Sequence, residues 1–285
     1  KDKNNPRFKD IFFLMKNLKM FCICVHNELL PKLKHINYIP VGLGDEKFDS
    51  EWLTDKSGEN ISEKNKYYGE YTFHYWFWKN EIKKIKDNDW IGFCAYRRFW
   101  MNEMKKFDEN KKFQDVTLSK VPKIWDDYEV ILGDKIEMNH IRWIKIIKYG
   151  KMSLIRNPKA IFRKNQNIRF QFDMFHGNGV LDRAIDVLDP KDRSDFKDYV
   201  NSNCSYNQGN MFICKSKELI VRYYEAIFNW LFECEKIFGF DLNGYANIRV
   251  YAFLAERFLP FWFNKYAKCL EWPIIFNDLR KENLS

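Results

Sequence analysis

The stretch Trp90-Ile91-Gly92-Phe93-Cys94-Ala95-Tyr96 is a run of apolar residues that ends abruptly in the cations Arg97-Arg98. A continuous apolar run of this length is typical of a strand that is buried on both faces of a parallel sheet. The polar residues Asp87-Asn88-Asp89 supply a turn just before it. We therefore expect a buried strand whose carboxyl end carries two guanidinium groups.

The rest of the chain alternates strand patterns with helical ones. Strand patterns occur at Met20–His26, Tyr38–Val41, Tyr128–Leu132 and Gly209–Cys214. Helical spacing occurs at Asn65–Asn80, where the aromatic face begins at a capping Asn65, and at Lys217–Phe238 and Asn247–Phe263. Strands that alternate with helices predict an α/β domain with a mostly parallel sheet flanked by helices.

Three charged segments interrupt this pattern. Met101–Lys123 is expected to be a surface insertion, and Gly133–Asn167 is basic, with no clear periodicity. Phe170–Asn201 has a helical pattern with a solvated acidic face formed by Asp189, Asp192, Asp195 and Asp198. We expect residues 1–19 to form a tail or short helix and residues 20–285 to form a single domain.

Composition restricts the classes of partner and compartment. The 285 residues include 48 Lys and Arg against 39 Asp and Glu, and this excess of +9 favours nucleic acid, anionic lipid or a phosphorylated substrate. The seven cysteines lie mostly in apolar runs, which indicates reduced thiols in a cytosolic protein. The sequence has no apolar run of 18 residues, so we expect no transmembrane helix.

The polar side chains at the end of the central strand are candidates for a ligand site. Ligands of open α/β sheets bind at the carboxyl ends of the strands. There Arg97 and Arg98, beside Tyr96, can hold a diphosphate through bidentate hydrogen bonds. The alternative is a pair of surface arginines in salt bridges.

Two further segments hold polar residues of interest. Asn60, Ser62, Lys64 and Asn65 lie where a loop meets a helix, which suits either an anion or a simple helix cap. Glu70 follows one turn later, either exposed or held by an arginine. Glu256 lies among apolar residues, where a carboxylate can act as a general base or pair with Arg257.

Other chemistries have weaker support. His176 could position a hydroxyl or a phosphate, or could be a core residue. Asp87 and Asp89 have the D-x-D spacing of metal-dependent sugar-nucleotide enzymes, but they precede the strand, and we favour a turn. The sequence has no phosphate loop, dinucleotide fingerprint, nucleophile elbow or H-E-x-x-H motif. The aromatics fall at core spacing, which argues against a nucleic-acid binder.

The strings NISEKNKYYGEYTFHYWFWKN (Asn60–Asn80) and DWIGFCAYRRF (Asp89–Phe99) resemble a bacterial capsular and exopolysaccharide glycosyltransferase family, domain of unknown function 4422. FCICVHN (Phe21–Asn27), GNMFICKSKEL (Gly209–Leu219) and AERFLPFW (Ala255–Trp262) follow the expected order, and the resemblance covers residues 20–275. It implies a GT-A-like nucleotide-diphosphosugar transferase, with galactofuranosyltransferase-type relatives. Gly133-Asp134-Lys135 and the surroundings of His176 depart from the family pattern.

The resemblance also implies roles for individual residues. The catalytic set is Glu256, Arg97 and Arg98, the arginines standing where many GT-A enzymes bind a metal. Donor-binding residues are His26, Asn27, Asn60, Ser62, Lys64, Asn65, Glu70 and Tyr96. Acceptor-binding residues are His176, Asn210 and Arg257. No metal ligand is assigned, and a site without Mn or Mg is favoured.

The expected reaction moves a hexose, galactofuranose or another, from a UDP-sugar to a surface polysaccharide such as capsule or lipopolysaccharide, or to a lipid-linked acceptor. We expect the protein in the cytoplasm, with peripheral contact at the inner face of the plasma membrane and no nucleic-acid partner. The alternative is a non-catalytic anion-binding module or a scaffold with a degenerate transferase fold.

Overall fold

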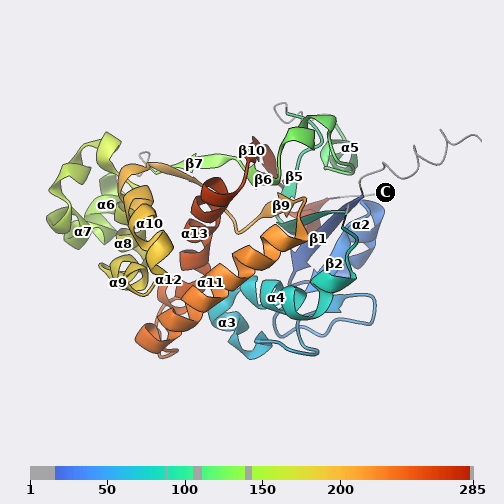
Figure 1. The fold of residues 1–285 in the computed structure, drawn as a ribbon, viewed down its shortest axis with the longest axis horizontal. Helices are drawn as coiled ribbons and strands as arrows, with labels where there is room; N and C mark the ends of the chain where they lie inside the picture. The colour runs from blue at the N-terminus through green and yellow to red at the C-terminus, as the bar shows by residue number, and fades with distance from the viewer. Residues whose placement is uncertain (1–16, 88, 105–110, 139–142, 283–285) are drawn as a thin grey trace, which may run out of the picture.

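The computed structural model describes residues 17–87, 89–104, 111–138 and 143–282, so most of the expected N-terminal tail lies outside the described residues. Its centre is a sheet with the strand order β10-β6-β9-β4-β1-β2-β3 (Figure 1). The strands are β1 (Leu18–Cys24), β2 (Ile39–Gly42), β3 (Leu53–Thr54), β4 (Trp90–Ala95), β6 (Val130–Gly133), β9 (Phe212–Cys214) and β10 (Cys269–Trp272). At the carboxyl end of β4, β5 (Arg98–Trp100) pairs with β4 and with β11 (Ile274–Phe276), and β7 (Lys135–Glu137) pairs separately with β8 (Ser205–Asn207).

The two apolar runs that were expected to be buried strands lie side by side at the centre of the sheet. β1 is parallel to both β2 and β4, with Phe21 opposite Phe93 in the register. The strand expected at 209–214 begins only at Phe212, and it runs antiparallel to β4 and β6. The other neighbours in the order β10-β6-β9-β4-β1-β2-β3 are parallel, while the short strands β5 and β11 pair antiparallel; the main order confirms the expectation of a mostly parallel α/β sheet.

Helices cover both faces of the sheet. One face packs against α4 (Tyr71–Trp76), α11 (Lys217–Phe238) and α13 (Val250–Tyr266), and the other face packs against α2 (Leu30–His35) and α5 (Phe113–Val116). Phe21 faces the first layer, and its neighbours Met20 and Cys22 face the second. This alternation explains why β1 is apolar at every position from Met20 to Cys24.

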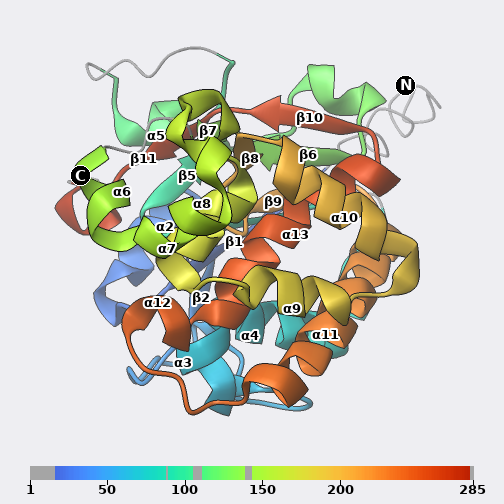
Figure 2. The same ribbon diagram turned by 90° about the vertical axis from the view of Figure 1, so that its left-hand side faces the viewer.

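The remaining helices form a separate group at one end of the molecule, most of them away from the sheet (Figures 1 and 2). They are α6 (Trp143–Tyr149), α7 (Lys151–Arg156), α8 (Ile168–His176), α9 (Val180–Asp186), α10 (Pro190–Ser202) and α12 (Tyr245–Ile248). Among the described residues, no helix is both long enough and apolar enough to cross a bilayer.

The aromatic helix expected over 65–80 is interrupted, and its expected cap is wrong. Gly69 has φ +55°, a conformation that disfavours side chains, and it separates α3 (Asn65–Tyr68) from α4. A Cβ at Gly69 would also lie 2.2 Å from Nη2 of Arg249, so the chain needs glycine here. Asn65 does not cap the helix start; its Nδ2 donates to the Gly69 carbonyl and to Oγ1 of Thr72 (both 3.0 Å).

Two expectations of solvated surface are also wrong in part. Met101, Phe113 and Leu118, within the expected insertion, are buried against the second face of the sheet; residues 105–110 lie outside the described residues. In the expected acidic face, Asp192 is only 1% exposed. Its Oδ1 accepts hydrogen bonds from Lys265 (2.8 Å) and from the Tyr266 hydroxyl (2.5 Å), because a buried carboxylate needs such partners.

His74 of α4 lies fully buried in the aromatic core, and its Nδ1 is 2.8 Å from the hydroxyl of Tyr224. Burial lowers the pKa of His74 to about 3, from the ordinary value of 6.5. The neutral imidazole is therefore the folded form, while the unfolded chain takes up a proton below pH 6.5. This group contributes stability above that pH, and the contribution is lost as the pH falls.

We expect acidification from pH 6.5 towards pH 3 to lower the free energy of unfolding through His74 by up to about 1.4 kcal/mol per pH unit. Urea unfolding at a series of pH values measures this slope. His74→Gln keeps a hydrogen-bonding group for Tyr224 but does not titrate, so its profile should be flatter. Identical slopes in the two proteins would contradict the assignment.

Candidate functional site

A cleft of about 510 Å³ opens at the carboxyl ends of β1 and β4. Adjacent parallel strands end at the same edge of a sheet, which is where the sequence placed the site. The walls come from the turn Ala95–Arg98, from Asn65, Gly69 and Glu70 at the α3–α4 junction, from Gly209–Met211, and from the first half of α13. Seven of the residues expected to form the site line it: Asn65, Glu70, Tyr96, Arg97, Arg98, Asn210 and Glu256.

Arg98 is a half-buried cation on the wall of this cleft. Its guanidinium lies over Gly209, where a Cβ would be only 3.0 Å from Nη1, and Gly209 has φ +99°. Within the described residues the Arg98 side chain makes no ion pair. A guanidinium on a cleft wall without a carboxylate partner is well suited to an anionic ligand.

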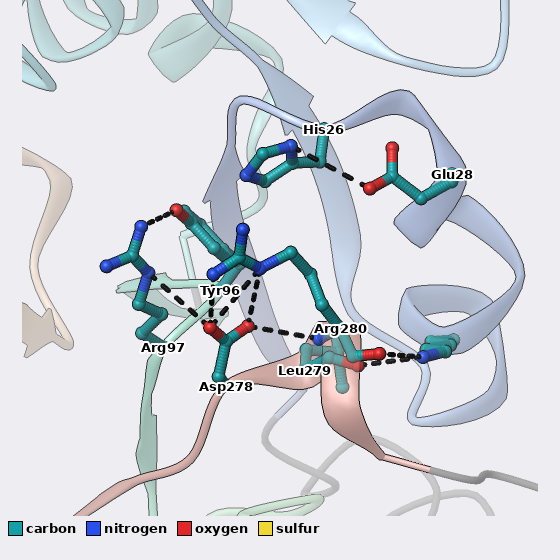
Figure 3. Close-up of polar contacts among 8 residues, drawn as sticks. His26, Glu28, Tyr96, Arg97, Asp278, Leu279 and Arg280 are labelled. Carbon is teal, nitrogen blue, oxygen red and sulfur yellow. Dashed lines mark hydrogen bonds and ion pairs between the residues drawn. The ribbon is translucent and has the colours of Figure 1, made fainter.

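Arg97 lies at the rim, in a cluster drawn in Figure 3. Its Nη2 donates to the Tyr96 hydroxyl, and its Nε is 3.9 Å from Oδ2 of Asp278. Asp278 also pairs with Arg280 (2.5 Å), and the hydrogen bonds from Arg280 are the main cause that lowers the pKa of Asp278. Arg97 and Arg280 thus share the carboxylate of Asp278, so these three side chains together keep one positive charge. Of the two alternatives for Arg97-Arg98, the salt bridge is present for Arg97, whereas Arg98 has no ion pair among the described residues and stays the candidate for holding a diphosphate.

Glu70 lies on the opposite wall and is held by two partners. Its Oε1 accepts from Nδ2 of Asn210 (2.8 Å), and its Oε2 accepts from Nη2 of Arg249 (3.2 Å). Of the two alternatives left open for this carboxylate, exposed or held by a partner such as an arginine, the structure shows the second. Asn210 is 6% exposed and has φ +47°, and its Oδ1 has no hydrogen-bond partner among the described residues. The amide nitrogen of Asn210 thus orients Glu70, while its buried oxygen has no hydrogen-bond partner in the described structure.

Glu256 of α13 is the second carboxylate of the cleft, and its side chain is 15% exposed. Its Oε1 accepts from the backbone N–H of Gly209 (2.7 Å), and its Oε2 pairs with Arg257. Arg257 is itself buried and donates to Oε1 of Gln171 (2.9 Å). A carboxylate has about four lone-pair sites, so these contacts orient Glu256 and leave capacity to accept a proton.

Comparison with known sequences identifies the family. The sequence pattern of the family described as "Domain of unknown function (DUF4422)" matches residues 19–267. The chain belongs to the DUF4422 family. No curated protein matches the DUF4422 chain in sequence.

A solved structure shares the fold. It is described as "WbbM bifunctional glycosytransferase apo structure", and it superposes with a TM-score of 0.68 at 18% sequence identity. The match covers 92% of the DUF4422 chain and 45% of that structure, so the chain spans less than half of the neighbour's length. Together with the mixed sheet, this likeness confirms the GT-A-like fold.

The other residues expected in the donor pocket of the DUF4422 chain lie outside the cleft. Lys64 donates to both carboxylate oxygens of Glu235 (2.7 and 3.0 Å), and Asn60 accepts from Ser62. His26 and Asn27 follow β1, and the His26 ring is 5.1 Å from the ring of Tyr96, at the rim.

Two residues expected to bind the acceptor form a layer behind the cleft wall. His176 stacks on Phe253 at 4.1 Å between ring centroids, and Phe253 lines the cleft. Arg257 lies behind Glu256 and does not line the cleft. Both residues can therefore position the wall residues that face a ligand.

The fold family implies a divalent metal, which an aspartate pair would hold. Asp87 and Asp89 do not fit, because they lie at the amino end of β4, where Asp87 pairs with Lys217 (2.6 Å). A different group, His26, Glu28 and Glu46, offers ligand atoms within 4.8 Å of one another, with Nδ1 of His26 3.7 Å from Oε1 of Glu28. Glu46 lies far from His26 and Glu28 in the sequence, so these three residues form no recognisable metal-binding motif.

Sequence reasoning also missed Asp278, Arg280 and Arg249. Asp278 and Arg280 lie about 180 residues from the arginine pair and follow no recognisable motif. Arg249 directly precedes α13, and only the fold brings it to Glu70. No local pattern could have joined these residues to the site.

Proposed function

We propose that the chain is a glycosyltransferase that moves a hexosyl group from a uridine diphosphate donor to a hydroxyl of a glycan or lipid-linked acceptor in bacterial surface polysaccharide synthesis. The observation that carries this proposal is Arg98, a guanidinium on the cleft wall without a carboxylate partner, with the oriented carboxylate Glu256 on the same cleft. The family and the fold support it. Galactofuranose is the first sugar to test.

In this reaction the acceptor oxygen attacks the anomeric carbon, and the bond from that carbon to the β-phosphate oxygen breaks. The electron pair of the broken bond goes to the diphosphate, where Arg98 and the rim cations Arg97 and Arg280 lower the free energy of the new charge. Glu256 takes the proton of the acceptor hydroxyl. Asn65, Glu70 and Tyr96 shape the donor side.

A metal would supply Lewis-acid stabilisation of the diphosphate if His26, Glu28 and Glu46 held one. The arginine cluster offers the same charge without an ion, and we therefore propose a metal-independent reaction. The chain's own guanidiniums then carry the leaving-group charge.

We expect transfer of radiolabelled sugar from one of a panel of UDP-sugars, UDP-galactofuranose included, in the presence of EDTA. Calorimetry should show saturable binding of UDP. Loss of all activity in EDTA with recovery in Mn²⁺ would contradict metal independence, and His26→Ala would then test the alternative ligands. Salt-sensitive binding to any polyanion, without saturable UDP binding or transfer, would favour the non-catalytic module.

A further inference from the structure

Helices α6 and α7 and the turns that follow them lie at the end of the molecule furthest from the sheet (Figure 1), and they face the viewer in Figure 2. We call residues 143–165 the basic lobe. The lobe packs onto α8 through a small apolar cluster formed by Ile146, Ala160, Phe170 and Met174. Its outer surface has two properties that the reaction in the cleft does not use.

The first property is exposed apolar surface. Seven of the twelve large apolar side chains that lie exposed in the described part of the chain belong to the lobe: Ile144, Ile147, Tyr149, Met152, Ile155, Ile161 and Phe162. Ile144 is 79% exposed and Ile155 is 73% exposed. Ile144 and Ile147, like Met152 and Ile155, are three residues apart on one helix and so share a face. Monomeric soluble proteins rarely gather apolar side chains in this way unless a partner covers them.

The second property is charge of one sign. The lobe contains seven cations and no acidic residue: Lys145, Lys148, Lys151, Arg156, Lys159, Arg163 and Lys164. The lobe therefore has a formal net charge of +7, compared with +9 for the whole chain. None of them pairs with a carboxylate among the described residues. Arg156, Lys159 and Lys164 also line a polar hollow of about 460 Å³ beside α8.

We propose that the basic lobe docks on the surface of an anionic phospholipid bilayer. The lysines and arginines would lie against lipid phosphates, and the isoleucines, Met152 and Phe162 would enter the boundary between headgroups and acyl chains. Interfacial helices combine these two features, because apolar burial and attraction to anionic lipid add together. Nucleic-acid surfaces use aromatic rings to stack on bases, whereas this surface is mainly aliphatic.

The lobe lies one helix away from the cleft. Phe170 and Met174 of α8 contact the lobe, while Gln171 of α8 accepts a hydrogen bond from Arg257, and His176 stacks on Phe253 of the cleft wall. A docked lobe would hold the cleft near the bilayer surface. The docking itself does not depend on the proposed reaction.

Co-sedimentation of the chain with phosphatidylglycerol–phosphatidylcholine vesicles tests the proposal. We expect binding to these vesicles and little binding to phosphatidylcholine alone. Lys145→Gln/Lys148→Gln/Lys151→Gln should weaken binding on the order of 10²-fold. The matched control, Lys83→Gln/Lys86→Gln/Lys120→Gln, removes the same charge from exposed positions elsewhere and should bind almost like the unchanged protein.

A second pair of variants tests insertion. Ile144→Glu/Ile155→Glu should abolish most of the binding, while Met104→Glu/Ile124→Glu, at exposed apolar positions outside the lobe, should lose much less. Circular dichroism checks that each variant is folded. Vesicle binding and sugar transfer are measured separately. A failure to bind vesicles would therefore not contradict the transferase proposal, and a failure to transfer sugar would not contradict membrane docking.

Four results would overturn the proposal. Equal losses in the lobe and control variants would mean a general charge effect. Unchanged binding of Ile144→Glu/Ile155→Glu would exclude insertion. A dimer in sedimentation velocity that Ile144→Glu/Ile155→Glu dissociates would assign the surface to a second copy of the chain, and tight duplex DNA binding without vesicle binding would assign it to nucleic acid.

Discussion

Arg98→Ala is expected to lower the turnover number for transfer from the UDP-sugar by about 10²- to 10³-fold, the usual cost of removing one preorganised donor to a developing negative charge. The half-buried guanidinium makes no ion pair in the described structure, so its removal leaves no carboxylate unpaired. We therefore expect the thermal unfolding temperature to change little. Steady-state kinetics and a melting curve of the same sample measure both effects.

Matched variants separate the effects of charge, geometry and position in this experiment. Arg98→Lys keeps the charge but loses the bidentate geometry. Its turnover number should therefore lie between that of the unchanged enzyme and that of Arg98→Ala. Arg97→Ala should also lower turnover, although Arg280 remains beside Asp278 to supply part of the rim charge. Arg222→Ala removes an exposed arginine of α11 outside the cleft and should be neutral. Normal turnover in both Arg97→Ala and Arg98→Ala would refute the assignment of the leaving-group site.

Glu256→Gln is expected to lower turnover by about 10²- to 10⁴-fold, because the amide cannot take the acceptor's proton. The affinity for UDP should stay near that of the unchanged enzyme, since the base acts on the acceptor side. Calorimetry with UDP and steady-state kinetics separate the two quantities. Glu70→Gln should instead weaken donor binding, because Glu70 pairs with Arg249 and orients Asn210.

The pair with Arg257 complicates the Glu256 variant and suggests its control. Glu256→Gln leaves the buried guanidinium of Arg257 without its carboxylate, which typically costs about 3–5 kcal/mol of stability. Glu256→Gln/Arg257→Met removes both charges and should recover much of that stability while turnover stays low. If activity per folded molecule is normal in either protein, Glu256 has only a structural role.

The sequence predicted those parts of the site that follow from local pattern. The apolar runs of β1 and β4 could be recognised because burial on both faces leaves no polar position, and their ends locate the cleft. Glu256 was a candidate base because of its apolar sequence neighbours, whereas Asn210 came only from the resemblance. The break at Gly69 escaped notice because apolar periodicity continues through it, and a glycine within such a pattern does not reveal its φ.

Other features depend on contacts between distant segments. The orientation of β9 between β4 and β6 is set by tertiary pairing, and three apolar residues do not encode a direction. The burial of Asp192 depends on Lys265 and Tyr266, more than 70 residues away. The basic run 133–167 lacked periodicity because its described residues form one short strand, β7, and short helices and turns with few buried positions.

Gly209 connects the two halves of the proposed chemistry. Its backbone N–H fixes the carboxylate of Glu256, and its missing side chain makes room for the guanidinium of Arg98. The spacing between the proton acceptor and the cation is therefore fixed by a single residue that carries no functional group. A substitution that shifts either Glu256 or Arg98 would therefore disturb the other. A change of substrate specificity would have to come from cleft residues away from Gly209.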